Sequence, residues 1–204
     1  MRQHTKVSEL PSESFEVDRA ELSNLLYGSK ENYETFSKIE EECGTGPLAH
    51  ELDRHEAFRI NLERARNIRE KIAENGYPRV DYMNNQTYGN LLNGMYPTSL
   101  SHAMFEALVR ILGDDRQSKA YLEDILDEKI VGCYAQTELG HGSDVQSLQT
   151  QAKYDPITQQ FVVNTPSVTA IKFWPGDLGK MANHVVFHGR LISQDKDHGV
   201  HAFF

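Results

Sequence analysis

The first 130 residues carry the spacing of apolar positions that is typical of helices. Between residues 48 and 74, apolar side chains recur mostly three or four positions apart, and charged residues fill the intervals. Asn75 and Gly76 follow, and both tolerate the left-handed conformation that ends a helix. The pattern therefore predicts a helix over 48–74 with seven inward positions: Leu48, Leu52, Phe58, Leu62, Ala65, Ile68 and Ile72.

Further helices are predicted along the same part of the chain. One covers 99–112, where Thr98 or Ser99 can cap the start and Gly113 follows the end. Its expected inward stripe is Leu100, Met104, Leu108 and Ile111.

Three other segments have weaker helical patterns. A helix over about 116–127 would place four side chains inward: Ala120, Tyr121, Ile125 and Leu126. Two short helices are predicted near 18–27 and 31–42.

From residue 131 the pattern changes to the alternation that is typical of strands. Apolar or small side chains at 148–154 alternate with glutamine and lysine. The segment Asp155–Thr158 is a predicted turn, because Pro156 presets its backbone angle and Asp155 can bond the backbone. The chain then returns as 161–163 to form a hairpin. Further strands are predicted at 167–172, 184–192 and 199–204.

Helices followed by strands predict an α+β fold with two segregated parts. We assign residues 1–130 to an N-terminal α-helical domain and residues 131–204 to a β domain. The chain ends in the apolar, strand-like run 200–204. We therefore expect the β domain to be truncated.

Composition excludes several classes of protein. A net charge of −9 among 204 residues argues against a general nucleic-acid binder, which needs a cationic surface. Cys43 and Cys133 are too few and too far apart for a disulfide framework, so a reducing compartment is the simpler interpretation. No apolar run approaches the roughly 20 residues needed to span a bilayer.

The nine histidines do not predict a metal site. His184 and His188 would share one face of a strand, and His198 and His201 are three positions apart. No cysteine or carboxylate cluster completes a recognisable ligand set around either pair. We therefore expect no metal.

The most unusual stretch is residues 133–144, at the point where helices give way to strands. Gly140, Gly142 and Ser143 are small enough to let backbone approach a ligand closely. The hydroxyl of Thr137 can both donate and accept hydrogen bonds. On composition alone, a glycine-containing connection between domains is the more natural interpretation.

A second unusual stretch, residues 171–180, holds the single tryptophan of the chain. Trp174, Pro175 and Gly176 form a stiff turn whose backbone is free to touch a ring. The alternative is that Trp174 is an aromatic at a strand end that packs on the core.

Several segments in order resemble the acyl-CoA oxidase family, of the peroxisomal type. Tyr-Ala-Gln-Thr-Glu-Leu-Gly-His-Gly at 134–142 is similar to the flavin signature of that family. The segments 150–156, 161–166 and 171–176 resemble its middle domain, and 94–100 resembles a segment upstream of the signature. The resemblance covers the chain from about residue 48 onward and identifies an N-terminal fragment.

The resemblance implies a fold and a set of binding residues. Residues 131–204 would be an incomplete β-barrel middle domain of the acyl-CoA oxidase and dehydrogenase fold. Thr137 matches the threonine that hydrogen-bonds FAD, and the backbone of Gly176 would lie against the same cofactor. Trp174 would pack near the flavin ring. Ser143 would lie on the substrate side, although a role in shaping the loop is equally open.

The resemblance also implies a reaction, the α,β-dehydrogenation of a fatty acyl-CoA to trans-2-enoyl-CoA. A carboxylate takes the α-proton, the β-hydride goes to FAD, and O2 is reduced to H2O2. In the family the catalytic glutamate comes from a C-terminal helical domain, so no catalytic residue is expected in this chain. Glu138 lies beside Thr137 but does not match the catalytic position, and a local hydrogen bond is its expected role.

The implied setting is peroxisomal fatty-acid β-oxidation by a homodimer. Two alternatives remain open: an acyl-CoA dehydrogenase, or a truncated fragment that only binds a partner. We expect this chain alone to show no oxidase activity, and to bind flavin weakly or not at all.

Overall fold

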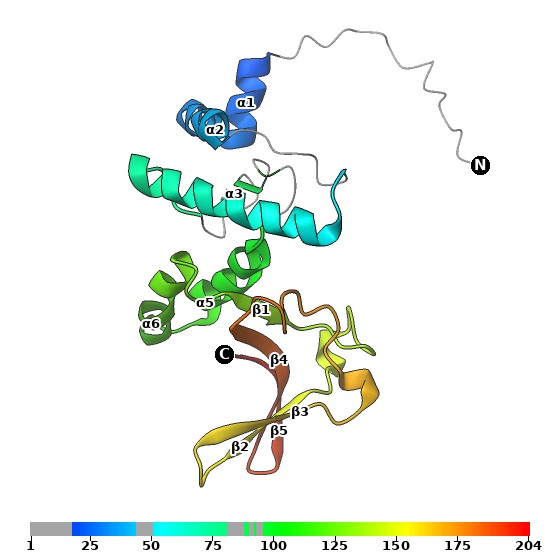
Figure 1. The fold of residues 1–204 in the computed structure, drawn as a ribbon. Helices are drawn as coiled ribbons and strands as arrows, with labels where there is room; N and C mark the ends of the chain where they lie inside the picture. The colour runs from blue at the N-terminus through cyan, green and yellow to red at the C-terminus, as the bar shows by residue number, and fades with distance from the viewer. Residues whose placement is uncertain (1–17, 44–50, 81–87, 90–91, 93–95) are drawn as a thin grey trace, which may run out of the picture. The chain divides into compact units, whose positions relative to one another are not determined.

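The structure, a computed structural model, describes residues 18–43, 51–80, 88–89, 92 and 96–204. It divides into two compact units, residues 1–42 and 43–204 (Figure 1). Leu48, Gly94 and Met95, which the sequence patterns include, lie outside the described residues.

The first unit contains two helices, α1 (Arg19–Tyr27) and α2 (Lys30–Cys43). The carboxylate of Asp18 caps α1, accepting from the backbone N–H groups of Ala20 and Glu21. Gly28 then takes a φ of +80°, which separates α1 from α2. The two short predicted helices are confirmed.

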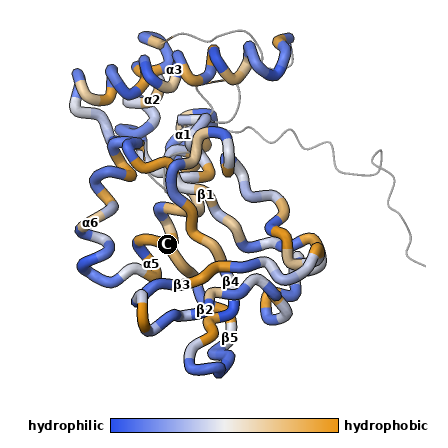
Figure 2. Tube along the Cα trace, turned by 60° about the horizontal axis from the view of Figure 1, so that its bottom comes forward, coloured by the Kyte–Doolittle hydropathy of each residue, from blue (hydrophilic) through white to orange (hydrophobic). Residues whose placement is uncertain are grey.

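The second unit begins with the long helix α3 (Arg54–Asn75). Asp53 caps it by accepting from the N–H groups of His55 and Glu56 at 2.8 and 2.9 Å, so the helix starts later than residue 48. Gly76 ends it with a φ of +67°, as predicted. Of the described positions predicted to face inward, Ala65, Ile68 and Ile72 are buried, whereas Phe58 and Leu62 are exposed. Figure 2 shows apolar and polar residues alternating along α3.

The predicted helix over 99–112 forms, but its first part is a π-helical turn, η3 (Ser101–Glu106), followed by α5 (Ala107–Leu112). The predicted inward stripe is largely wrong, because Leu100, Met104 and Ile111 are exposed and only Leu108 is partly buried. The wider π turn brings a different set of side chains inward: Ser101, His102, Phe105, Glu106 and Val109.

Thr98 has a further role besides the predicted cap. It directly precedes the first helical residue, Ser99, and its hydroxyl donates to the Glu128 carboxylate at 2.6 Å. A donated bond leaves the hydroxyl oxygen able to accept, so capping by Thr98 or Ser99 stays a prediction.

The helix α6 (Asp115–Leu126) confirms the predicted segment near 116–127. Asp114 and Gln117 form a reciprocal capping box at its start. Ile125 is fully buried, but the predicted inward residues Ala120 and Tyr121 are exposed. Leu122, which lies one position further along, packs on the core in their place.

Five strands follow the helices, which confirms the α+β class. They are β1 (Gly132–Ala135), β2 (Gln151–Asp155), β3 (Gln160–Asn164), β4 (His184–Ser193) and β5 (Lys196–Phe203). β4 is the central strand (Figure 1). It pairs in parallel with β1 through 184–187 and with β2 through 190–192, and it pairs antiparallel with β5. The last described helix before the sheet ends at Leu126, and the boundary at residue 131 stays a prediction.

The predicted hairpin is confirmed, since β2 and β3 pair antiparallel around the turn at 156–159. Asp155 accepts from the N–H of Ile157 at 2.9 Å, the bond that the sequence suggested. The predicted strand over 167–172 is wrong, because Val168–Ala170 is a 3-10 turn, η5. Hydroxyls of Ser167 and Thr169 both bond the side-chain oxygen of Gln149, and this side-chain network replaces a strand ladder.

One apolar cluster joins the helices to the sheet. Its buried members are Phe105, Val109, Ile125, Ile130 and Val186. Gly132 lies directly on the Phe105 ring, where a Cβ would come within 1.9 Å of the ring carbon Cγ. This contact sets how closely the π turn approaches β1. Within the described ranges, no helix is both long and apolar enough to cross a membrane.

Candidate functional site

The loop that carries Thr137, residues 136–150, leaves β1 and returns as β2. Both strands pair with β4, β1 along its first half and β2 along its second half. The two ends of the loop are therefore held by one strand. Fixed ends of this kind let a loop present side chains in a defined place.

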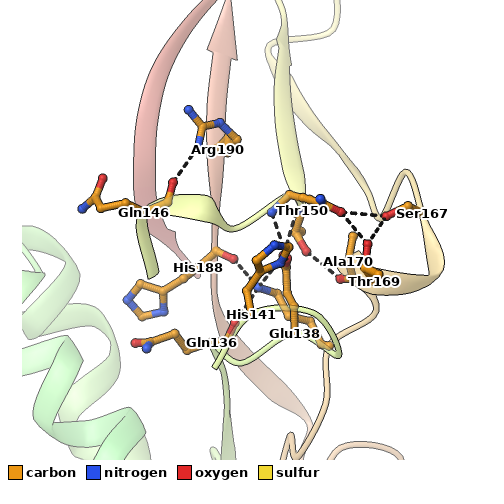
Figure 3. Close-up of polar contacts among 12 residues, drawn as sticks. Gln136, Glu138, His141, Gln146, Thr150, Ser167, Thr169, Ala170, His188 and Arg190 are labelled. Carbon is orange, nitrogen blue, oxygen red and sulfur yellow. Dashed lines mark hydrogen bonds and ion pairs between the residues drawn. The ribbon is translucent and has the colours of Figure 1, made fainter. Parts of the chain in front are cut away.

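Glu138 anchors this loop from inside. Its side chain is 1% exposed and accepts from the backbone N–H groups of Gln149 at 2.9 Å and Thr150 at 2.7 Å. His141 Nδ1 lies 3.1 Å from the same carboxylate (Figure 3). Burial alone would raise the pKa of Glu138, but hydrogen bonds from Thr150 and Gln149 and the charge of Lys172 outweigh it and lower the pKa to about 2. Glu138 is therefore an ionised anchor and a poor proton acceptor.

Lys172 ties three parts of the chain to one ammonium group. Its Nζ donates to the carbonyl oxygens of Gln136 at 2.8 Å and His188 at 2.6 Å, and lies 3.3 Å from Glu138 Oε1. Burial lowers the pKa of Lys172, and the Glu138 carboxylate opposes that effect. The loop, the 171–180 stretch and β4 are thus fastened at one point.

The two unusual stretches lie side by side. The N–H of Phe173 donates to the Thr137 carbonyl at 2.9 Å, and the N–H of Leu139 donates to the Ile171 carbonyl at 2.9 Å. The N–H of Gly140 continues the pairing with the Thr169 carbonyl. The structure therefore brings Thr137 next to the turn that holds Trp174 and Gly176, although they are distant in sequence.

Trp174 does not pack on the core of the described chain. Its side chain is 84% exposed, and its φ of +69° is unusual for a bulky residue. The neighbouring Phe173 is also exposed, with the two ring centroids 6.1 Å apart. The alternative of a core aromatic does not fit this position. An exposed aromatic on a strained backbone is instead suited to meeting another group.

Gly176 lies against the start of the 99–112 helix. A Cβ at this position would come within 2.3 Å of Leu100 Cδ1, so only glycine allows this approach without displacing the leucine. The turn after Trp174 is thereby seated on the helical part.

Ser143 lies on the exposed outer part of the 136–150 loop. Its carbonyl accepts from the N–H of Val145 at 3.0 Å. Gly142 beside it has open space where a Cβ would be, so no steric demand selects glycine there. The substrate-side role of Ser143 stays a prediction.

A cavity of about 790 Å³ lies between α3, the segment 96–100 and the turn after Gly176. Its apolar lining includes Phe58, Pro97, Leu100 and Met181, and its polar lining includes Arg54, His55, Asn61, Tyr96, Ser99, Asp177 and Lys180. Burial raises the pKa of the Asp177 carboxyl.

The sequence patterns did not predict this cavity. The signal was present in the spacing of Arg54, Phe58 and Asn61, which share one side of a helix. In the described part of the chain, no group of three or more His, Cys, Asp or Glu side chains is placed to hold a metal ion.

Comparisons with known proteins agree on one family. The family model described as acyl-coenzyme A oxidase N-terminal matches residues 18–131. Peroxisomal acyl-coenzyme A oxidase 1 of Arabidopsis thaliana is 35% identical over 196 residues, which are 92% of this chain and 29% of that protein. The chain therefore spans less than a third of this relative's length.

Solved structures give the same result. An acyl-CoA oxidase from Lycopersicon esculentum superposes with a TM-score of 0.74 at 34% identity, covering 90% of this chain and 28% of the other. Acyl-CoA oxidase-2 of Caenorhabditis elegans, solved with FAD, ascaroside-CoA and ATP, superposes with a TM-score of 0.74 at 30% identity. That match covers 90% of this chain and 29% of the other.

Proposed function

Because the chain belongs to the acyl-CoA oxidase family, we propose that it supplies the flavin-positioning part of an enzyme that oxidises fatty acyl-CoA. The reaction removes the α-proton and the β-hydride of the thioester to give trans-2-enoyl-CoA, and O2 becomes H2O2. The proposed setting is a homodimer in the peroxisome, in line with the name of the plant relative.

The residues around Thr137 fit FAD on their own chemistry. A flat ring needs an apolar surface and nearby hydrogen-bonding groups. The exposed indole of Trp174 is one such surface, and the segment that carries it is bonded through the Phe173 N–H to Thr137, whose hydroxyl can donate or accept. Gly176 has no side chain of its own, and Leu100 of the 99–112 helix occupies the space where a Cβ would stand. Bound FAD would supply the hydride acceptor and the route of electrons to O2.

The single observation that carries this proposal is the bond from the Phe173 N–H to the Thr137 carbonyl. It joins the stretch that carries Thr137 to the stretch that carries Trp174 and Gly176. Glu138 and Lys172 hold that region from inside, so its groups are fixed before a ligand arrives.

The substrate has a natural place in the cavity beside this region. Phe58, Pro97, Leu100 and Met181 would contact an acyl chain, and Ser143 would lie toward the thioester and CoA. Glu138 is committed to backbone N–H groups, so we propose that the carboxylate that takes the α-proton lies in the remaining part of a protein of the relatives' length.

The test is release of H2O2 from an acyl-CoA in air, measured with a peroxidase-coupled dye on a protein of the relatives' length that carries this chain. We expect activity in the parent and loss of both activity and bound flavin absorbance in Thr137→Ala and Trp174→Ala. Ser147→Ala, an exposed change in the same loop, is the control. Full activity and flavin content in both site variants would contradict the proposal. The 204-residue chain alone should release no peroxide.

A further inference from the structure

A buried histidine outside the candidate site stands between two carboxylates. His102 is 1% exposed. Its Nδ1 lies 2.8 Å from Glu106 Oε2, and its Nε2 lies 3.4 Å from Glu128 Oε1. An ionised carboxylate only accepts hydrogen bonds, and a neutral imidazole has one N–H to donate. Protons on both ring nitrogens, as in an imidazolium, would let His102 donate to both carboxylates.

Each carboxylate also has a cation of its own. Arg110 donates to Glu106 Oε1 at 2.8 Å, and Arg69 from α3 pairs with Glu128 Oε2. Burial alone would raise the pKa of Glu128, but hydrogen bonds from His102 and Thr98 and the charge of Arg69 lower it to about 2. Three cations and two anions thus share one cluster, and losing the charge of His102 would leave two arginines facing two carboxylates.

The cluster joins three segments at the wall of the cavity. His102 and Glu106 lie in the π turn, Arg69 lies in α3, and Glu128 lies between α6 and β1 with a φ of +54°. The cavity is lined by four residues that precede His102: Tyr96, Pro97, Ser99 and Leu100. Thr98 within that segment donates directly to Glu128. The contacts of Glu128 with His102 and Thr98 therefore also hold the cavity wall at Tyr96–Leu100.

We propose that His102 is a pH-sensitive latch, which in its charged form fastens the cavity wall at Tyr96–Leu100 to the α6–β1 junction and on losing a proton in alkaline solution releases it. The inference concerns this chain by itself and stands whether or not the proposed oxidase function holds.

The groups that face His102 agree with this behaviour. Burial by itself would lower the pKa of His102, but the hydrogen bonds and charges of Glu106 and Glu128 outweigh it, so its pKa is raised. Burial and the charge of Glu128 raise the pKa of the nearby Tyr96 hydroxyl, which therefore stays protonated over the same range. His102 is thus the group in this cluster that changes charge first as the solution turns alkaline.

The first experiment reads the protonation of His102 by NMR on the 204-residue chain labelled with 15N-histidine, with the peak assigned through its backbone. We expect both ring nitrogens to be protonated at pH 7, and a titration midpoint above the ordinary value of 6.5. The exposed His201 is the internal control. A neutral tautomer of His102 at pH 7 would overturn the proposal, and this readout needs no variant to fold.

The second experiment measures hydrogen exchange of the amides of Ser99 and His102, which donate to the carbonyls of Tyr96 and Thr98. After correction for the intrinsic rate, protection in the wild type should fall as pH rises through the His102 midpoint. His102→Gln should lack that protection at every pH, while His201→Gln follows the wild type. Protection that is independent of pH in the wild type, or equal in His102→Gln, would refute the latch.

Discussion

Two carboxylates, the buried Glu138 and the half-buried Glu128, reach the same electrostatic state by different routes. In both, burial raises the pKa and hydrogen bonds and a nearby cation bring it down to about 2. Glu138 is held chiefly by backbone N–H groups of its own loop. Glu128 is held by side chains, including a histidine that can lose its charge. The backbone N–H groups that hold Glu138 do not titrate, whereas the proposed latch at Glu128 would respond to pH.

The largest expected effect comes from removing the backbone-held anchor. Glu138→Ala leaves the N–H groups of Gln149 and Thr150 unpaired and Lys172 without its buried counter-ion. We expect the free energy of unfolding to fall by about 3–5 kcal/mol, measured by urea denaturation.

The matched control is Glu63→Ala, which breaks an exposed pair with Arg59 on α3. That change should cost less than about 1 kcal/mol. Equal losses in the two variants would mean that Glu138 is not the anchor of its loop.

The second effect compares packing in the two regions. Gly132→Ala would push a Cβ to 1.9 Å from the buried Phe105 ring in the π turn, and we expect a loss of about 3 kcal/mol. Gly142→Ala in the loop meets open space and should change stability by less than about 0.5 kcal/mol. Thermal or urea unfolding distinguishes these outcomes, and a tolerated alanine at 132 would refute the tight contact between the π turn and β1.

Part of this fold could be predicted from the sequence. The periodicity of apolar residues located α3, α6 and the β2–β3 hairpin, and Asn75–Gly76 marked a helix end correctly. It placed the wrong face of 99–112 inward, because a π turn leaves no signature in spacing that assumes a regular helix.

The candidate site was predictable only in part, because some of its contacts come from segments that are distant in the sequence. Sequence motifs pointed to Thr137, Trp174 and Gly176, and the structure places these stretches together. The run 167–172 was expected to be a strand because of Val168, Thr169 and Ile171, but its hydroxyl bonds to Gln149 depend on a partner from a distant segment. Lys172 and the cavity likewise depend on contacts across the chain that no local pattern encodes.

A third effect compares single hydroxyls with a charged and with a neutral acceptor. Thr98→Val removes a hydrogen bond to the charged Glu128, with an expected loss of roughly 1.5 kcal/mol. Ser118→Ala removes a bond to the neutral carbonyl of Val109, with an expected loss of about 0.5 kcal/mol. Urea unfolding checks the order, and the reverse order would argue against a charged cluster around Glu128.

The smallest expected effect is the pH profile of stability. Glu128 and Glu138 have lowered pKa values, so their contribution is present above 4.5 and is lost as pH falls toward about 2. His102 has a raised pKa, so its contribution is present below 6.5 and is lost as pH rises through the folded pKa. Burial lowers the pKa of His188, so this histidine destabilises the fold at low pH, and that penalty is lost as pH rises to 6.5.

The difference in the free energy of unfolding between wild type and His102→Gln gives the contribution of His102 to this profile. Urea unfolding at a series of pH values should show an advantage of the wild type that is largest below 6.5 and declines above it. A difference that is constant with pH would mean that His102 does not exchange a proton on folding.

The central claim, that the Thr137 loop and the Trp174–Gly176 turn form one flavin-binding unit, can be measured through the single tryptophan of the chain. FAD titrated into the 204-residue chain should quench Trp174 fluorescence along a weak but saturable curve, because the exposed indole would meet the flavin ring directly. Thr137→Ala should lose the saturable part. Quenching that rises linearly with FAD and is identical in the two proteins would contradict the account.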